Sequence, residues 1–167
     1  MDYICAPWRS DYFTEKPKDC PFCSIVAHPK MDEKQGVLFR ADFCFGIMNL
    51  YPYSPGAFMV IPYEHTDKIE LLSEEAWQEI SFFVRKGVEI LKTKAGAKGV
   101  NIGMNLGKAA GAGIAEHVHY HLVPRWEGDT NFITTIANVR VNGVSFYPLY
   151  EKIKAGFDEI SSLKKIK

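Results

Sequence analysis

Three histidines, His117, His119 and His121, alternate with hydrophobic or aromatic residues in the run His-Val-His-Tyr-His-Leu. Residues two apart lie on the same face of a β-strand, so the three imidazoles are expected on one side. The alternating Val118 and Leu122 would then point into the core. Because three polar rings on one face give up apolar packing, the spacing favours a chemical role for the run.

Two chemistries are compatible with such a face. One is a three-histidine metal centre in which a bound water is the nucleophile. The other is attack by a neutral imidazole whose second ring nitrogen is held by a hydrogen bond. The preceding segment, residues 107–113, consists mostly of glycine and alanine, and the backbone N–H groups of Gly111, Ala112 and Gly113 could approach a phosphate closely. Beside the histidines, this loop favours phosphate chemistry.

A second group of candidate residues begins with Cys20 and Cys23, which have the C-x-x-C spacing of a zinc knuckle or a redox pair. The polar residues before Cys20 argue against the strand that a thioredoxin-like unit requires. The sequence has no second C-x-x-C, so histidines would have to complete a metal site. Cys20, Cys23, His65 and His117 would form a closed, tetrahedral, structural zinc site. The alternative is two thiols in a turn and a solvated His65.

Hydrophobic periodicity indicates the elements that position these residues. The expected strands span residues 37–40, 43–48, 57–61, 100–105 and 116–123, with a further β-like stretch at 129–144. A helix is predicted from Ser73 to about Lys94, and an amphipathic C-terminal helix over residues 149–167. The order predicts an α+β fold: an antiparallel sheet of about five strands, a long central helix and a C-terminal helix. Residues 1–167 would form one domain that begins with an N-terminal arm, residues 1–19.

Composition excludes several classes of partner. The chain has 167 residues, and its 20 basic and 20 acidic side chains give a formal net charge of zero. A long-range field that gathers nucleic acid is therefore not expected. No apolar stretch is long enough to span a bilayer, so no membrane partner is expected. The start lacks the features of a secretory signal, which predicts a cytoplasmic protein whose cysteines are thiols or metal ligands.

The histidine run resembles the signature of the histidine-triad (HIT) superfamily of nucleotidyl hydrolases and transferases. The matching motif is residues 117–123, followed by Pro124 and Arg125. The resemblance extends to Asn49, the Pro55-Gly56 pair and the C-x-x-C segment. Residues 6–9 together with the C-x-x-C segment look like a bacterial branch of the family, and residues 124–132 are similar to branch members described as diadenosine polyphosphate hydrolases or phosphorylases.

The resemblance implies a role for each histidine. His119 would attack the α-phosphorus of a nucleotide and form a covalent nucleotidyl-histidine intermediate. His121 would help to hold the phosphate oxygens. His117 would be structural, and in the zinc-bearing relatives this position binds the metal.

The resemblance also implies a nucleotide site and an assembly. Asn49 matches an asparagine that contacts ribose, Ile47 a position in the base pocket, and Asn105 falls near a polar residue used at the phosphate. The expected partner is a small nucleotide such as diadenosine tetraphosphate, with any Mg²⁺ carried by the polyphosphate. The family also implies a homodimer with a continuous sheet.

One departure from the family pattern bears on the acceptor. Dinucleotide hydrolases usually carry Gly-Gln-Ser or Gly-Gln-Thr before the triad, whereas this chain has Ala112-Gly113-Ile114. The missing glutamine leaves room beside His119 for inorganic phosphate, which favours phosphorolysis. The alternatives are hydrolysis of nucleoside phosphoramidates, a nucleotide-binding regulatory module with little catalysis, and a metal-dependent hydrolase that uses all three histidines as ligands.

Overall fold

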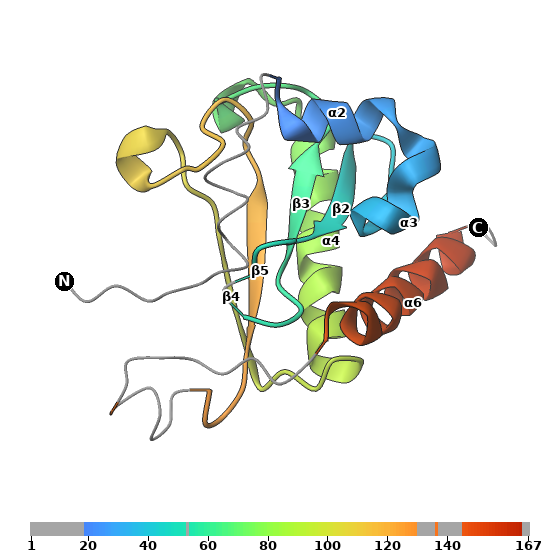
Figure 1. Cartoon of the computed structure of the whole chain (residues 1–167). Helices are drawn as coiled ribbons and strands as arrows, with labels where there is room; N and C mark the ends of the chain where they lie inside the picture. The colour runs from blue at the N-terminus through green and yellow to red at the C-terminus, as the bar shows by residue number, and fades with distance from the viewer. Residues whose placement is uncertain (1–18, 53, 130–135, 137–144, 165–167) are drawn as a thin grey trace.

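The computed structural model describes residues 19–52, 54–129, 136 and 145–164 (Figure 1), with side chains described up to residue 160. The predicted N-terminal arm, apart from Asp19, and nearly all of the β-like stretch at 129–144 lie outside these residues. Within the described part the predicted α+β architecture is confirmed, because an antiparallel sheet of five strands is combined with a long helix and a C-terminal helix.

The strands of the sheet follow the order β1-β2-β3-β5-β4. Their bounds are β1 Val37–Arg40, β2 Cys44–Met48, β3 Phe58–Pro62, β4 Gly99–Gly103 and β5 Tyr120–Arg125. All neighbours are antiparallel. The strand predicted to begin at residue 116 begins at Tyr120 instead, where pairing with Val60 starts. Before that point the Val118 N–H donates to the Thr66 carbonyl (2.8 Å), outside the β3–β5 ladder.

Helix α4, Glu74–Thr93, confirms the predicted central helix. Its N-cap is Ser73, whose hydroxyl accepts a hydrogen bond from the Ala76 N–H (3.2 Å). Most of its apolar side chains, including Ile80, Val84 and Leu91, are buried against the sheet. At Gly87 the helix lies so close to the sheet that an added Cβ would be 2.6 Å from the Phe58 ring and 2.8 Å from Leu122. The missing side chain therefore allows the close packing of α4 on β3 and β5.

Helix α6, Phe146–Lys164, begins earlier than the predicted residue 149. Pro148 lies in its first turn, where a proline is tolerated because that N–H has no partner within the helix. The helix packs against β1 and α4 and buries Tyr150, Ile153 and Phe157. Together α4 and α6 cover one face of the sheet (Figure 1). Neither they nor the other described helices have the length and apolar character that a bilayer crossing requires.

The other face is covered by short helices that the sequence did not predict. Helix α2, Pro21–Ala27, is followed by the 3₁₀ turn η2, Pro29–Met31, and by α3, Asp32–Gln35. From α2, Phe22 packs against a smaller apolar cluster of the strands: Val37, Phe45, Ile47 and Ile61. Two further 3₁₀ turns lie in loops, η3 at Ile69–Leu71 and η4 at Lys108–Ala110. Helices this short carry too little periodicity to be recognised from sequence.

Candidate active site and metal centre

The histidine run lies on the face of the sheet that α2 covers. His121 belongs to β5, opposite Met59 of β3, whereas residues 117–119 form the extended lead into the strand. The Phe22 ring lies 5.4 Å from the His117 ring and 5.1 Å from the His119 ring, centroid to centroid. The rings of His119 and His121 are 4.8 Å apart. The expected common face is therefore observed, although two of the three histidines precede the strand.

His119 is buried, with 6% of its surface exposed, and its orientation is fixed by the backbone. Its Nδ1 lies 2.8 Å from the carbonyl oxygen of His117. A carbonyl can only accept, so Nδ1 carries the proton and Nε2 has a free lone pair. Burial lowers the pKa of His119, which keeps the ring neutral near pH 7. A neutral imidazole with a defined tautomer is the form that nucleophilic attack requires.

His121 is half-buried beside His119. Burial and, to a lesser degree, the neighbouring His119 ring lower the pKa of His121 to about 4. The ring is therefore neutral near pH 7 and keeps one N–H donor. Such a donor can bond a phosphate oxygen without bringing a positive charge beside the nucleophile.

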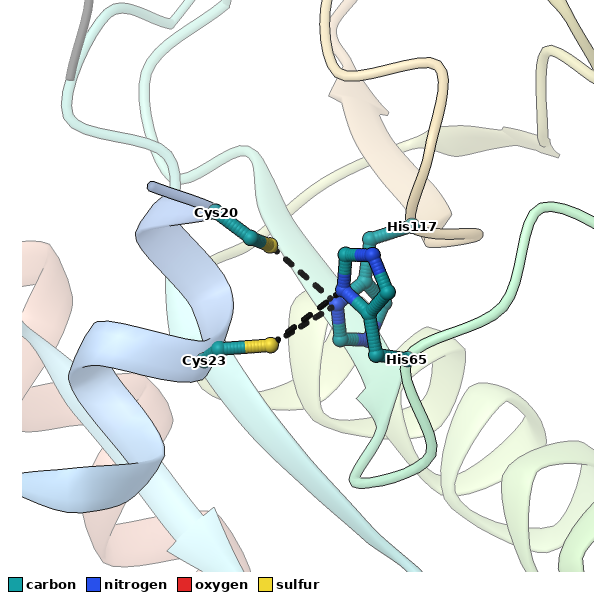
Figure 2. A group of neighbouring side chains, drawn as sticks. All are labelled: Cys20, Cys23, His65 and His117. Atoms are coloured by element: carbon teal, nitrogen blue, oxygen red, sulfur yellow. Dashed lines mark hydrogen bonds between the residues drawn. The ribbon is translucent and has the colours of Figure 1, made fainter. Parts of the chain in front are cut away.

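Four side chains from distant parts of the chain form a group that could hold a metal ion. The ligand atoms of Cys20, Cys23, His65 and His117 all lie within 4.8 Å of one another (Figure 2). The Cys20 thiol is 3.3 Å from Nδ1 of His117, and the Cys23 thiol is 3.3 Å from Nδ1 of His65. The two cysteines come from the start of α2, and the two histidines from the loops after β3 and before β5. The structure thus brings together the four residues that the sequence indicated.

The backbone prepares His117 for a metal. Its Nε2–H donates to the carbonyl of Pro62 (3.0 Å), which leaves the Nδ1 lone pair facing the two thiols. Burial lowers the pKa of His117, which favours the neutral, ligating form. Burial and the adjacent Cys20 raise the pKa of Cys23, an effect that a bound cation would reverse. A Cys₂His₂ donor set with an oriented histidine fits a closed structural zinc site.

This geometry argues against one of the alternatives. A metal bound by all three histidines of the run would need a ring nitrogen of His117 to face His119 and His121. Both nitrogens of His117 are already directed elsewhere, one to Pro62 and one to the thiols. Among the described residues, the group that could hold a metal includes His117 without the other two.

The residues expected to contact the nucleoside lie along β2 and just after it. Ile47 is buried, and the register places it opposite Met59, which in turn pairs with His121. Ile47 and His121 therefore lie on one face, separated by a single strand. Asn49 follows β2, where its side-chain oxygen accepts from the Tyr51 N–H (2.9 Å).

The small-residue loop, residues 107–113, is held by hydrogen bonds within itself and to Asn105. The Asn105 side-chain amide donates to the Gly111 carbonyl (3.4 Å). The N–H groups of Gly111 and Ala112 donate to the carbonyls of Lys108 and Gly107, at 3.0 and 3.3 Å. Two of the N–H groups expected at the phosphate are thus engaged in the loop, and binding through them would require these bonds to be shared or broken.

The structure reveals supporting residues that sequence reasoning missed. Phe22 stands between the two cysteines and contacts both His117 and His119. The Pro62 carbonyl fixes one histidine and the Thr66 carbonyl holds the run at Val118. A backbone acceptor leaves no trace in the sequence, because any residue has a carbonyl. The position of Phe22 between Cys20 and Cys23 in the sequence was the one feature that could have indicated its place beside the site.

Comparison with known proteins identifies the family of the chain. A family model of the HIT domain matches residues 30–128, which include the whole histidine run. The chain belongs to the HIT domain family. An AP-4-A phosphorylase of Mycobacterium tuberculosis is 36% identical over 149 residues, which cover 84% of this chain and 76% of the relative.

Two further relatives bear on the site. An adenosine 5′-monophosphoramidase of Schizosaccharomyces pombe is 32% identical over 146 residues, covering 86% of this chain and 96% of the relative. A zinc-bound histidine triad family protein of Mycobacterium smegmatis has a similar crystal structure. Its TM-score is 0.69 at 25% identity, and the match covers 87% of this chain and 97% of the other. HIT family members thus include a zinc-bound protein of this fold.

Proposed function

We propose that this protein is an enzyme that cleaves dinucleoside polyphosphates, such as diadenosine tetraphosphate, through a covalent nucleotidyl-His119 intermediate. The observation that carries the proposal is the hydrogen bond from His119 Nδ1 to the His117 carbonyl, which leaves a neutral ring with a free Nε2. The 36% identity to an AP-4-A phosphorylase supports the substrate class.

The reaction would proceed in two displacements. In the first, the His119 Nε2 lone pair forms a bond to the α-phosphorus, and the bond from that phosphorus to the bridging oxygen breaks. The leaving nucleoside polyphosphate takes the electron pair. In the second, an oxygen of water or of inorganic phosphate attacks the same phosphorus, the N–P bond breaks, and His119 recovers its lone pair. Dividing one difficult step into two in this way is the benefit of a covalent nucleophile. The His121 N–H is placed to bond a phosphate oxygen in both steps.

We propose inorganic phosphate as an acceptor alongside water. The family glutamine before the triad is absent, and Ile114 follows Gly113 at that point and packs against the apolar cluster around Phe22. An apolar side chain cannot orient a water molecule by hydrogen bonding. The phosphorylase activity named for the Mycobacterium tuberculosis relative supports the same acceptor.

The nucleotide would lie along the α2 face. We propose that Ile47 contacts the base and Asn49 the ribose, since both lie at or just beyond the strand next to β3. The phosphates would be met by the loop residues, for which the candidates are Asn105, Gly111, Ala112 and Gly113. Any Mg²⁺ would arrive with the polyphosphate, whose oxygens are the ligands that this ion prefers.

Cys20, Cys23, His65 and His117 would hold a structural zinc ion. When bound, zinc would cross-link α2 to the loops that carry His65 and His117, and as a closed site it would take no part in the chemistry. The zinc-bound histidine triad protein of Mycobacterium smegmatis supports this assignment. Thiol ligands remain reduced in the cytoplasm, which is the location we propose.

We also propose that two copies associate through β4. This strand is the last in the order β1-β2-β3-β5-β4, and its Asn101, Ile102 and Gly103 are exposed. Ile102 is 54% exposed, which is unfavourable for a free apolar side chain on an edge strand. Pairing of two β4 edges would bury it and make one continuous sheet.

The test is incubation of the protein with diadenosine tetraphosphate, with and without inorganic phosphate, and chromatography of the products. ADP and ATP formed with phosphate indicate phosphorolysis, and AMP and ATP formed without it indicate hydrolysis.

The second candidate function, cleavage of adenosine 5′-monophosphoramidate, is favoured by the relative from Schizosaccharomyces pombe. Faster cleavage of that compound than of the dinucleotide would replace the first proposal. Binding of either compound without turnover would indicate a regulatory module.

A further inference from the structure

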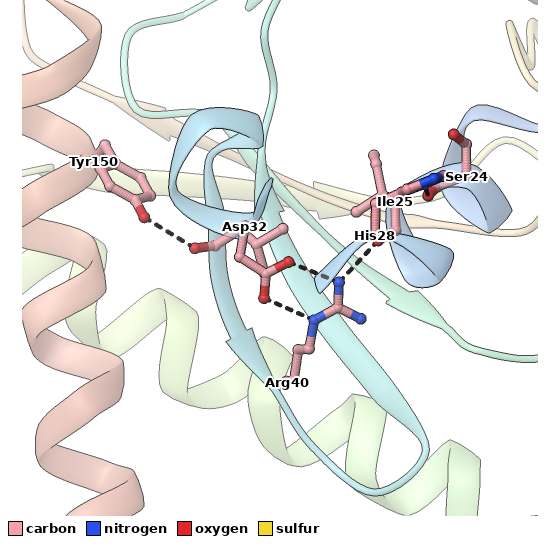
Figure 3. Close-up of polar contacts among 7 residues, drawn as sticks. Ser24, Ile25, His28, Asp32, Arg40 and Tyr150 are labelled. Carbon is pink, nitrogen blue, oxygen red and sulfur yellow. Dashed lines mark hydrogen bonds and ion pairs between the residues drawn. The ribbon is translucent and has the colours of Figure 1, made fainter. Parts of the chain in front are cut away.

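Arg40, the last residue of β1, joins this strand to α2 and α3 (Figure 3). Its guanidinium makes a bidentate ion pair with Asp32 of α3, with both N–O distances at 2.8 Å. One of the same nitrogens also donates to the carbonyl of Ile25 in α2 (2.9 Å). A planar guanidinium can make these bonds together because its donors form a rigid fork.

The same side chain reaches the histidine side of the metal centre. The Arg40 guanidinium lies 5.8 Å from the centre of the Phe45 ring. Phe45 in turn stacks on Tyr63, with centroids 5.7 Å apart. Tyr63 directly follows Pro62, whose carbonyl orients His117. Arg40 is therefore bonded to the cysteine helix α2 and linked, through the Phe45 ring, to the segment whose Pro62 carbonyl orients His117.

Helix α2 needs such support. It has seven residues, the side chain of its N-cap Cys20 makes no capping hydrogen bond to the helix, and Phe22 is its one buried residue. A helix this short is not stable by itself in water. Its last carbonyls have no partner within the helix, and a cation at this end also interacts favourably with the helix dipole.

We propose that Arg40 is a positioning residue that holds the cysteine helix α2 against the histidine side of the metal centre and thereby sets the affinity for zinc. Cys20 and Cys23 lie on α2, so a shift of the helix changes both thiol positions. Phe22 moves with them, and its ring contacts His119. The effect on His119 rests on the proposed function, whereas the effect on zinc does not.

The experiment measures zinc(II) affinity of the full chain by competition with a chromophoric chelator, for the wild type, Arg40→Ala and Arg40→Lys. Loss of a partner that orients metal ligands typically weakens metal binding about 10–100-fold, and we expect Arg40→Ala in that range. Arg40→Lys keeps the charge without the fork and should recover part of the affinity. Cobalt(II) in place of zinc should show a changed visible spectrum in Arg40→Ala, because the ligand geometry is altered.

Arg125→Ala is the matched control. Arg125 makes an equivalent bidentate pair with Asp129 but has no contact with α2 among its described bonds. Its zinc affinity should equal that of the wild type. A folded Arg40→Ala protein with wild-type zinc affinity overturns the proposal, and if that variant does not fold, Asp32→Asn and Arg40→Lys are judged by the same criterion. For Arg40→Ala, a lower kcat for diadenosine tetraphosphate with little change in KM supports the link from Arg40 to His119 through Phe22. A wild type that binds zinc but cleaves no dinucleotide defeats the proposed function and leaves the zinc comparison valid.

Discussion

The two faces of the sheet are built in different ways. On one face, α4 and α6 cover a large apolar cluster and come so close that Gly87 has no room for a side chain. On the other, the seven-residue helix α2 covers a small cluster, and the buried groups beside it include His117 and His119. The first face provides apolar burial, the main source of stability. Because that burial stabilises the fold, the α2 face can bury the polar rings of His117 and His119.

The two buried histidines on the α2 face nevertheless have hydrogen-bond partners. Burying an imidazole without partners costs free energy, but each of the two buried rings donates to a backbone carbonyl. Those bonds also fix the tautomers that the metal and the proposed reaction require. The comparison teaches that substitutions on the α4 face should change stability, and substitutions on the α2 face should change chemistry.

The largest expected effect is that of His119→Ala on turnover. Removing a covalent nucleophile should lower kcat for diadenosine tetraphosphate by on the order of 10⁴-fold or more. The melting temperature should change little, and nucleotide binding, measured by calorimetry, should persist. Retention of substantial activity would exclude the covalent mechanism.

The next effect is that of Cys20→Ser on the metal. Loss of a thiolate ligand should weaken zinc binding more than loss of a supporting partner does, hence by more than about 100-fold. Elemental analysis should find about one zinc per wild-type chain and far less in the variant. Cys44→Ser, which changes a buried cysteine outside the metal group, is the control. Equal zinc content in all three proteins would contradict the site.

A smaller effect is expected for Gly87→Ala on the opposite face. The added Cβ would meet Phe58 and Leu122 at 2.6 and 2.8 Å, so the free energy of unfolding should fall by about 1–3 kcal/mol. Zinc affinity should not change. Ser81→Ala, at an exposed position of the same helix, should stabilise slightly through helix propensity. Urea unfolding of both variants measures the difference, and a stabilised Gly87→Ala protein would refute the close packing.

The smallest effect concerns pH. The pKa of His121 is lowered to about 4, so between pH 6.5 and 4 the unfolded chain binds a proton that the folded chain excludes. Stability is therefore lost as the pH falls through this range, and His121→Gln should remove that share of the loss. Because the ring is partly open to solvent, we expect about 1 kcal/mol. Urea titrations of the wild type and of His121→Gln at pH 7 and 4.5 measure this loss of stability. Equal losses in the two proteins would show that His121 is not responsible.

Much of the fold could be predicted from periodicity. The Ser73 cap and the apolar positions of the central helix located α4 almost to the residue, because a long amphipathic helix repeats its signal many times. Helix α2 could not be predicted in this way, because a helix of seven residues is too short for its apolar pattern to repeat. The start of β5 was misplaced because alternation continues through residues 117–119, while the partner strand is available only from Tyr120.

The candidate site divides along similar lines. The cysteine spacing and the histidine run indicated the four residues that the structure brings together as a possible metal site, since these side chains carry their chemistry in the sequence. The carbonyls of Pro62 and His117 that set the tautomers could not be predicted, because a backbone acceptor is independent of residue type. Arg40 was indicated only as part of a strand. Its contacts with Asp32, Ile25 and Phe45 depend on separate segments meeting in space.

The place of β5 between β3 and β4 has a consequence for the order of assembly. Strands β1, β2 and β3 pair with sequence neighbours, so they can form while the chain is being synthesised, whereas β5 pairs both with its neighbour β4 and with the distant β3, so the sheet is complete only after β5 has been made. Cys20 and His117 are 97 residues apart, so closing that loop is entropically costly until the sheet is complete. The metal ligands and the proposed nucleophile are therefore brought together in one late folding event, and an unfinished chain has neither.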